Sequence, residues 1–135
     1  MKPYWDTSGL VNAFNRGIKP EGQTRTHSVA EFFSTLSRTG ITVVKDGVSR
    51  RLIFKPQDTA TAARDVFKDL DFVDLDGPET LAAVDKAADE GVEGGQIYDW
   101  IHCRTADKGQ APYIFSLNIR HFERMTRLEL KHPSA

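Results

Sequence analysis

The stretch that decides the fold is Tyr4-Trp5-Asp6-Thr7-Ser8-Gly9, near the start of the chain. Two aromatic residues that favour a buried strand lead directly into an aspartate, two hydroxyls and a glycine, a pattern typical of a strand passing into a helix. We therefore expect Asp6 at the carboxyl end of a strand. Ligands of open α/β sheets bind beyond those ends, so Asp6 is a candidate site residue. An aspartate at this position also suits a helix N-cap or a turn.

Outward from this stretch, segments with helix and strand patterns alternate along most of the chain. Helical spacing of apolar residues predicts helices over residues 8–15, 28–38, 59–69, 76–91 and 96–107, the third of them capped by Asp58. Apolar runs predict strands over residues 72–75, 112–116 and 127–130, a hairpin over 41–54, and a polar loop over 18–26. This order predicts a single α/β domain over residues 1–135, with a mostly parallel sheet covered by helices on both faces.

The composition narrows the class of protein. A chain of 135 residues can form one domain with its own hydrophobic core. Its 18 basic and 19 acidic side chains nearly cancel, so any nucleic acid must be bound through a local basic patch. The single cysteine, Cys103, excludes an internal disulfide and fits a reducing cytosol. No apolar run approaches the roughly 20 residues of a membrane span, so we expect a soluble, cytoplasmic protein.

Two further acids lie on predicted helices, each turned away from the apolar face of its helix. Glu31 lies outside the apolar stripe of the second helix, and Asp99 lies outside that of the fifth. Periodicity alone assigns both to solvated helix faces. Asn118 follows the strand predicted over residues 112–116 and leaves it at the same sheet edge as Asp6. These polar side chains could therefore converge on one site.

A different cluster is possible on the fifth helix. His102 and Cys103 follow Asp99 at spacings of three and four residues, so the three side chains could share a face suited to metal binding or nucleophilic chemistry. The alternative is structural: a lone helical cysteine is usually a small core residue, and a lone histidine usually a partner in the core or at its rim.

Four blocks of the sequence resemble the PIN-domain family, and within it the VapC-type toxin ribonucleases of bacterial toxin-antitoxin pairs. They occur in the order of the family and span nearly the whole chain. The blocks are Trp5-Asp6-Thr7-Ser8-Gly9-Leu10, His27-Ser28-Val29-Ala30-Glu31-Phe32, Gly94-Gly95-Gln96-Ile97-Tyr98-Asp99 and Ser116-Leu117-Asn118-Ile119-Arg120-His121-Phe122.

The resemblance implies a three-layer α/β/α sandwich whose acidic pocket binds Mg2+ or Mn2+ and cuts RNA. By the matching blocks, Asp6, Glu31 and Asp99 are the expected metal-binding and catalytic acids. Asn118 stands where many relatives carry a fourth aspartate, and it adds a carbonyl oxygen without a charge. Thr7 and Ser8 are expected to orient Asp6 or a water molecule from behind, although either could simply cap the helix.

The same resemblance implies partners for this pocket. RNA beside clustered acids needs cations at the rim, for which we single out Arg25, Arg104, Arg120 and His121, with Lys19 and Lys108 nearby in sequence. Structured RNA such as tRNA is the implied substrate class. A cognate antitoxin protein and a homodimer are also implied.

Two other functions stay open. The first is a catalytically inactive PIN-fold module that binds RNA or a protein, which Asn118 favours. The second is a phosphatase with Asp6 as a covalent nucleophile, although Ser8 stands where such an enzyme would need an aspartate.

Overall fold

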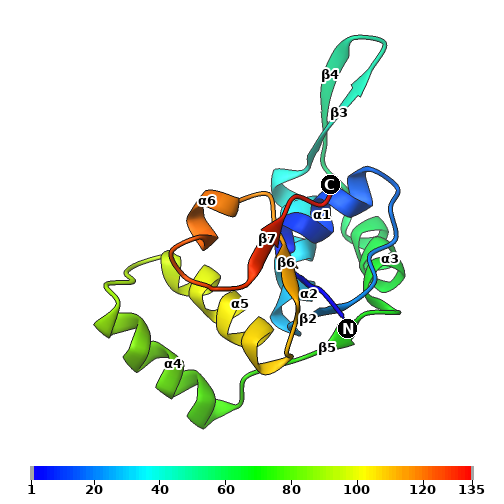
Figure 1. Cartoon of the computed structure of the whole chain (residues 1–135). Coiled ribbons are helices and arrows are strands. Elements are labelled where there is room, and N and C mark those ends of the chain that lie inside the picture. The colour runs from blue at the N-terminus through cyan, green and yellow to red at the C-terminus, as the bar shows by residue number, and fades with distance from the viewer. Residues whose placement is uncertain (1, 135) are drawn as a thin grey trace.

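A five-stranded sheet forms the centre of the computed structural model, which describes residues 2–134; the expected domain ends at residues 1 and 135 lie outside it. The strands are β1 (Tyr4–Trp5), β2 (Gln23–Thr24), β5 (Asp71–Phe72), β6 (Tyr113–Phe115) and β7 (Glu129–Lys131). They lie in the order β5-β2-β1-β6-β7, and every neighbouring pair is parallel. This confirms the predicted α/β fold with a mostly parallel central sheet (Figure 1).

Helices cover both faces of this sheet. Successive residues of a strand point to opposite sides, so apolar neighbours such as Tyr4 and Trp5 give each face an apolar surface that helices can cover. The helices are α1 (Thr7–Asn15), α2 (His27–Ser34) continued by η1 (Thr35–Thr39), α3 (Pro56–Phe67), α4 (Gly77–Asp89), α5 (Gln96–Lys108) and α6 (Ile119–Phe122). On β1, Trp5 packs into a core with residues of α1, α2 and α3, whereas Tyr4 packs into a second core with residues of α5 and α6. The result is the expected three-layer arrangement.

The loop predicted over residues 18–26 is wrong in part, because it contains β2. Gln23 and Thr24 form this strand although both are polar. Their burial is possible because the Thr24 hydroxyl contacts the carbonyl oxygen of Trp5 and the hydroxyl of Ser28, each at 2.8 Å. A polar strand of two residues carries no periodicity that a sequence pattern could reveal.

Helix ends agree with the sequence at α4 and differ at α3. Asp76 caps α4 through a capping box, in which its carboxylate accepts from the Glu79 backbone and the Glu79 carboxylate accepts from the Asp76 backbone. Asp58 does not cap α3 as predicted. The helix begins at Pro56, three residues earlier than predicted, because proline fits its first turn, and Lys55 occupies the N-cap position.

The predicted hairpin is confirmed as β3 (Ile41–Lys45) paired antiparallel with β4 (Val48–Leu52) around Asp46 and Gly47. It forms a separate two-stranded sheet that projects away from the rest of the molecule (Figure 1). We refer to residues 41–55 as the arm. The arm is anchored where the Phe54 N–H donates to the Leu36 carbonyl at 2.9 Å.

No helix within residues 2–134 combines the length and the apolar character that crossing a membrane requires.

Gly40 closes η1 and begins the arm with a backbone φ of 75°, which favours glycine. A Cβ atom at Gly40 would lie 2.2 Å from the carbonyl oxygen of Leu52. We expect Gly40→Ala to lower the free energy of unfolding in urea by at least about 2 kcal/mol, because strain and a backbone clash add. Gly17→Ala is the matched control, since Gly17 has a φ of 67° with open space around its Cβ position. Equal losses in the two variants would contradict the clash.

Candidate active site

Asp6 lies at the carboxyl end of β1 and is also the N-cap of α1. The strand-end position and the N-cap, which the sequence suggested as alternatives, therefore apply to the same residue. Its Oδ1 accepts hydrogen bonds from the Gly9 N–H at 2.7 Å and from the Ser8 hydroxyl at 2.8 Å. Its Oδ2 accepts one from the Ser116 hydroxyl at 2.6 Å. The side chain is buried, and the three hydrogen bonds fix the orientation of its carboxylate at the end of β1.

Burial raises the pKa of the Asp6 carboxyl, although His102 and the three hydrogen-bond donors oppose this. A carboxylate in this setting is costly to the folded chain whenever it is ionised. Such a position is typical of a functional acid.

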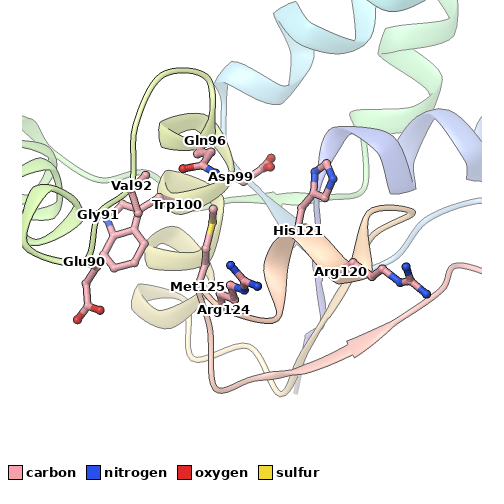
Figure 2. A pocket seen from close by; sticks show the side chains of 10 residues that line it. All are labelled: Glu90, Gly91, Val92, Gln96, Asp99, Trp100, Arg120, His121, Arg124 and Met125. Atoms are coloured by element: carbon pink, nitrogen blue, oxygen red, sulfur yellow. The ribbon is translucent and has the colours of Figure 1, made fainter.

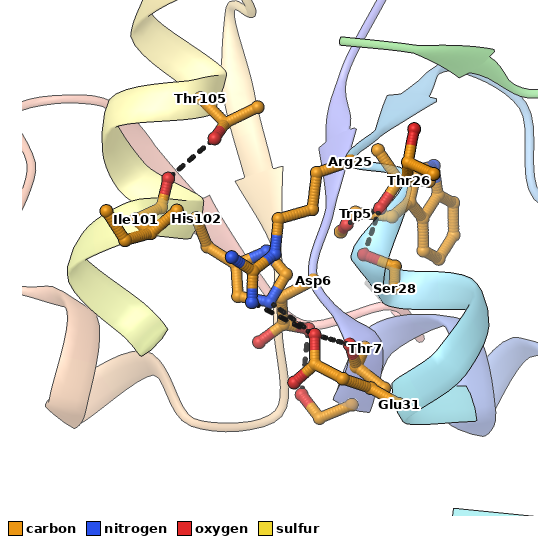
Figure 3. Close-up of polar contacts among 12 residues, drawn as sticks. Trp5, Asp6, Thr7, Arg25, Thr26, Ser28, Glu31, Ile101, His102 and Thr105 are labelled. Atoms are coloured by element: carbon orange, nitrogen blue, oxygen red, sulfur yellow. Dashed lines mark hydrogen bonds and ion pairs between the residues drawn. The ribbon is translucent and has the colours of Figure 1, made fainter. Parts of the chain in front are cut away.

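Glu31 extends from α2 into the same pocket, and the solvated helix face that periodicity alone assigned to it is wrong. Its Oε1 lies 3.2 Å from the Thr7 hydroxyl, 3.1 Å from Nη2 of Arg25 and 3.5 Å from Nε2 of His102. Figure 3 shows these side chains converging on Glu31 beside Asp6. Burial raises the pKa of Glu31, but His102 and Arg25 outweigh it and hold the pKa at about 2. Glu31 is therefore ionised and paired.

Arg25 and His102 are the site residues whose positions the sequence analysis did not predict. Arg25 follows β2 at the carboxyl edge of the sheet and is 8 % exposed, so it lies inside the pocket rather than at an RNA-facing rim as predicted. His102 is 3 % exposed, and its Nδ1 lies 2.7 Å from the Tyr4 hydroxyl on β1. The pocket thus holds its own counter-ion beside Glu31. The sequence analysis missed the position of Arg25 because it did not predict β2, the strand that directs Arg25 into the pocket.

Asp99 lies in the first turn of α5 and lines a cavity of about 420 Å³ between α5 and α6. Figure 2 shows Asp99 and His121 directed into the space between these two helices. Burial raises the pKa of Asp99, while His102 and His121 lower it and the nearby charge of Glu31 raises it further. This mutual influence places Asp99 and Glu31 in one electrostatic environment. Arg120 and Arg124 line the same cavity.

Asn118 lies at the start of α6, at the same sheet edge, and its side chain is exposed. The loop that carries it is tied to Asp6: the Asn118 N–H donates to the Ser116 hydroxyl at 2.9 Å, and the Leu117 N–H donates to the Ser8 hydroxyl at 3.0 Å. Ser8 therefore orients Asp6 through a hydrogen bond to its carboxylate, whereas the Thr7 hydroxyl donates to Glu31.

Three of the predicted cations are engaged away from the acids. Arg104 lies over the ring of Trp100 at 4.2 Å and forms an ion pair with Asp107. Lys108 is at the other end of α5 from Asp99 and contacts Glu79 at 2.6 Å. Lys19 forms an ion pair with Asp69. Of the cations singled out from the sequence, Arg120 and His121 are the two that line the cavity with Asp99.

Asp99, His102 and Cys103 do not form the nucleophilic face considered above. Cys103 is fully buried in the core beside Tyr4 and Ile114, and burial raises the pKa of its thiol to about 12. The thiolate is therefore scarce at neutral pH, and Cys103 is a core residue.

The chemistry of the donors fits a hard divalent cation, because carboxylate and amide oxygens are the groups that Mg2+ and Mn2+ favour. As placed, however, no group of three or more His, Cys, Asp or Glu side chains within residues 2–134 is arranged to hold a metal ion. Glu31 is engaged by Arg25 and His102, and both oxygens of Asp6 accept hydrogen bonds. Binding of one ion by Asp6, Glu31 and Asp99 would therefore require these side chains to rearrange.

Comparison with known proteins identifies a similar fold. The chain superposes on a chain from the structure of VapBC-1 of nontypeable Haemophilus influenzae with a TM-score of 0.64 and 12 % sequence identity, over 100 % of both chains. No protein-family model matches the sequence. No curated protein matches it either. At this identity the match establishes the fold, which agrees with the α/β sandwich described above.

The acids of the pocket should affect stability in opposite directions. Asp99→Asn should leave the free energy of unfolding at pH 7 unchanged or raise it, because it removes a charge whose burial is costly. Glu31→Gln should lower it by roughly 1–3 kcal/mol, because Arg25 and His102 lose their anionic partner. Urea denaturation of both variants and of the wild type measures this. Two equal losses would contradict the environments described here.

The effect of each variant on the free energy of unfolding should disappear at low pH. Glu31 has a pKa below its ordinary value of 4.5, so its contribution is complete above pH 4.5 and is lost as the pH falls toward about 2. The deficit of Glu31→Gln should therefore close over that range. Asp99 has a raised pKa, so any gain in Asp99→Asn should vanish as the pH falls below 3.8, where both states bind the proton.

Proposed function

We propose that this chain is a divalent-metal-dependent ribonuclease of the toxin-antitoxin type, which hydrolyses phosphodiester bonds in structured RNA such as tRNA. The observation that carries the proposal is the position of Asp6. It is a buried carboxylate with a raised pKa at the carboxyl end of the central strand. His102 lowers the pKa values of Asp6, Glu31 and Asp99 alike, and the charge of Glu31 raises the pKa of Asp99, so the three acids lie near one histidine. Buried acids with raised pKa values are typical of catalytic sites.

Cations beside Asp99 support a phosphodiester substrate. Arg120, His121 and Arg124 line the cavity that Asp99 enters, so a phosphate there would be neutralised next to the acids (Figure 2). Asp6, Glu31 and Asp99 would hold Mg2+ or Mn2+, with the amide oxygen of Asn118 as an uncharged addition. When bound, the ion would supply a water of lowered pKa and a positive charge against the phosphate. Ser8 and Ser116 keep Asp6 oriented throughout.

A protein partner is part of the same proposal. The fold is similar over its full length to a chain of VapBC-1, which supports a cognate antitoxin for this chain. An antitoxin that brings a basic side chain to the acidic pocket would compete with RNA for Asp99. A homodimer is proposed with it, because closed two-fold association is the commonest form of soluble oligomers.

One specific contact favours an inactive binding module instead. Glu31 is already paired with Arg25 and His102, so the pocket is partly neutralised without a metal. If that pairing persists in solution in the presence of Mn2+, the chain binds RNA or a protein without turnover.

Cleavage of end-labelled total tRNA distinguishes these functions. We expect cuts by the purified wild-type chain with Mn2+ or Mg2+ and none with EDTA. Asp99→Asn should reduce the rate by about 100-fold or more, because it removes a ligand and a charge. Asp85→Asn is the matched control, since it makes the same aspartate-to-asparagine change at an exposed position on α4.

Cleavage that survives in Asp99→Asn would show that the nuclease uses another site or is a contaminant. No cleavage by antitoxin-free protein that still binds Mn2+, over a range of RNAs, would favour the inactive module.

Association is tested by light scattering after gel filtration. We expect a dimer at concentrations near 100 μM, roughly the range of moderately weak protein association. Co-expression with the small protein encoded beside it should give a complex in which tRNA cleavage is suppressed. A chain that stays monomeric and captures no neighbour-encoded protein would contradict both proposed partners.

A further inference from the structure

We infer that the arm, residues 41–55, is a second contact for RNA, which binds the phosphate backbone outside the acidic pocket. This inference rests on the proposed function, because it assigns part of the same substrate to a surface that the pocket does not include. Charge, exposure and position carry it, each from a separate observation.

The charge of the arm departs from that of the whole chain. The arm contains four basic side chains, Lys45, Arg50, Arg51 and Lys55, and one acidic side chain, Asp46. Its net charge is therefore +3 in a chain whose formal net charge is −1. A chain of this overall charge needs a local basic patch to hold a polyanion, and the arm is such a patch.

These cations are available to a ligand. None of the four forms an ion pair with an acid anywhere in the part of the chain that the structure describes. By contrast, Lys19 is paired with Asp69, and Lys108 with Glu79. All five residues of β4 are exposed, so the strand covers no part of the core. The arm therefore carries unneutralised charge on a strand that packing does not require.

The register of the hairpin distributes the cations over both faces. Val43 pairs with Arg50, and Lys45 pairs with Val48, so Lys45 and Arg50 lie diagonally across the two strands on one face. Arg51 pairs with Thr42 and lies on the other face. A ribbon with cations on both faces suits contact with successive phosphates rather than readout of bases, since side chains cannot read the deep, narrow major groove of A-form RNA.

Two helical segments connect the acidic pocket with the arm: α1 begins after Asp6 and ends at Asn15, and α2 with its continuation η1 carries Glu31 and ends before Gly40. Asp6 follows β1, Arg25 follows β2 and Asn118 follows β6, so the pocket lies at the carboxyl edge of the parallel sheet. Figure 1 shows the arm projecting beyond α1, away from the rest of the molecule. The side-chain amide of Asn15, the last residue of α1, donates to the Thr42 carbonyl at 3.3 Å and holds the arm there. One RNA could contact both surfaces.

The arm also exposes four apolar side chains, which could suit a protein ligand instead of RNA. They are Val44, Val48, Leu52 and Ile53. Val48 and Leu52 lie on the same face as Lys45 and Arg50, which interrupt them, whereas Val44 lies on the opposite face. The charge argument therefore favours the polyanion, and a protein ligand becomes an outcome of the test.

The test measures binding of a fluorescently labelled RNA hairpin by anisotropy, in EDTA and with Asp99→Asn in every protein, so that no turnover occurs. The arm variant combines Lys45→Gln, Arg50→Gln and Lys55→Gln, three side chains that form no hydrogen bond or ion pair within residues 2–134. The control variant removes the same charge elsewhere, through Lys68→Gln, Lys86→Gln and Arg127→Gln, which are exposed at the C-cap of α3, on α4 and in the segment before β7.

We expect the arm variant to lose at least about 10-fold in affinity at 50 mM salt, with a salt slope reduced in magnitude by roughly 2, because three phosphate contacts release fewer counterions. The control variant should change affinity by less than about 2-fold. Equal behaviour of the two variants, or RNA binding unchanged while antitoxin binding or dimerisation is lost, would overturn the inference. Since binding is measured without turnover, failure of tRNA cleavage by the wild type would count against the proposed function alone.

Discussion

Three hydrogen bonds to the buried carboxylate of Asp6 connect the elements on which the site depends. The donors come from the first turn of α1, through Gly9 and Ser8, and from the end of β6, through Ser116. Without these donors, a carboxylate at this depth would be too costly to keep ionised. Because the same two serines also accept from the backbone of the loop after β6, the position of α6 depends on Asp6 as well.

The other acids of the pocket differ from Asp6 in how their charge is balanced. Glu31 is balanced by Arg25 and His102, and its pKa is low; Asp99 has no direct partner at hydrogen-bonding distance within the described residues, and its pKa is raised. Asp6 and Glu31 are therefore satisfied by hydrogen bonds and an ion pair from the protein, and among the described residues Asp99 is the acid of the three that lacks such a partner. Arg25 therefore sets the charge that any incoming cation meets, and its pairing with Glu31 competes directly with a metal.

The sequence predicted the elements whose side chains repeat with a period, and it missed those defined by contacts between distant residues. Helices α1, α2, α4 and α5 were predictable from apolar spacing, and Asp6 from the passage of a strand into a helix. The strand β2 was not, because it is short and polar and is stabilised by hydrogen bonds to Trp5 and Ser28. His102 was not placed in the pocket because its partner, Tyr4, is 98 positions away. The roles of the acids themselves came from resemblance to a family.

The burial of Cys103 gives this protein a chemical reporter of its own folding. It is the one thiol of the chain, it has no exposed surface, and burial raises its pKa to about 12. A thiol reagent at neutral pH therefore meets a reactive group only when α5 separates from β1 and β6. Since α5 also carries Asp99 and His102, the rate of labelling reports the opening events that dismantle the pocket, with no probe added to the protein.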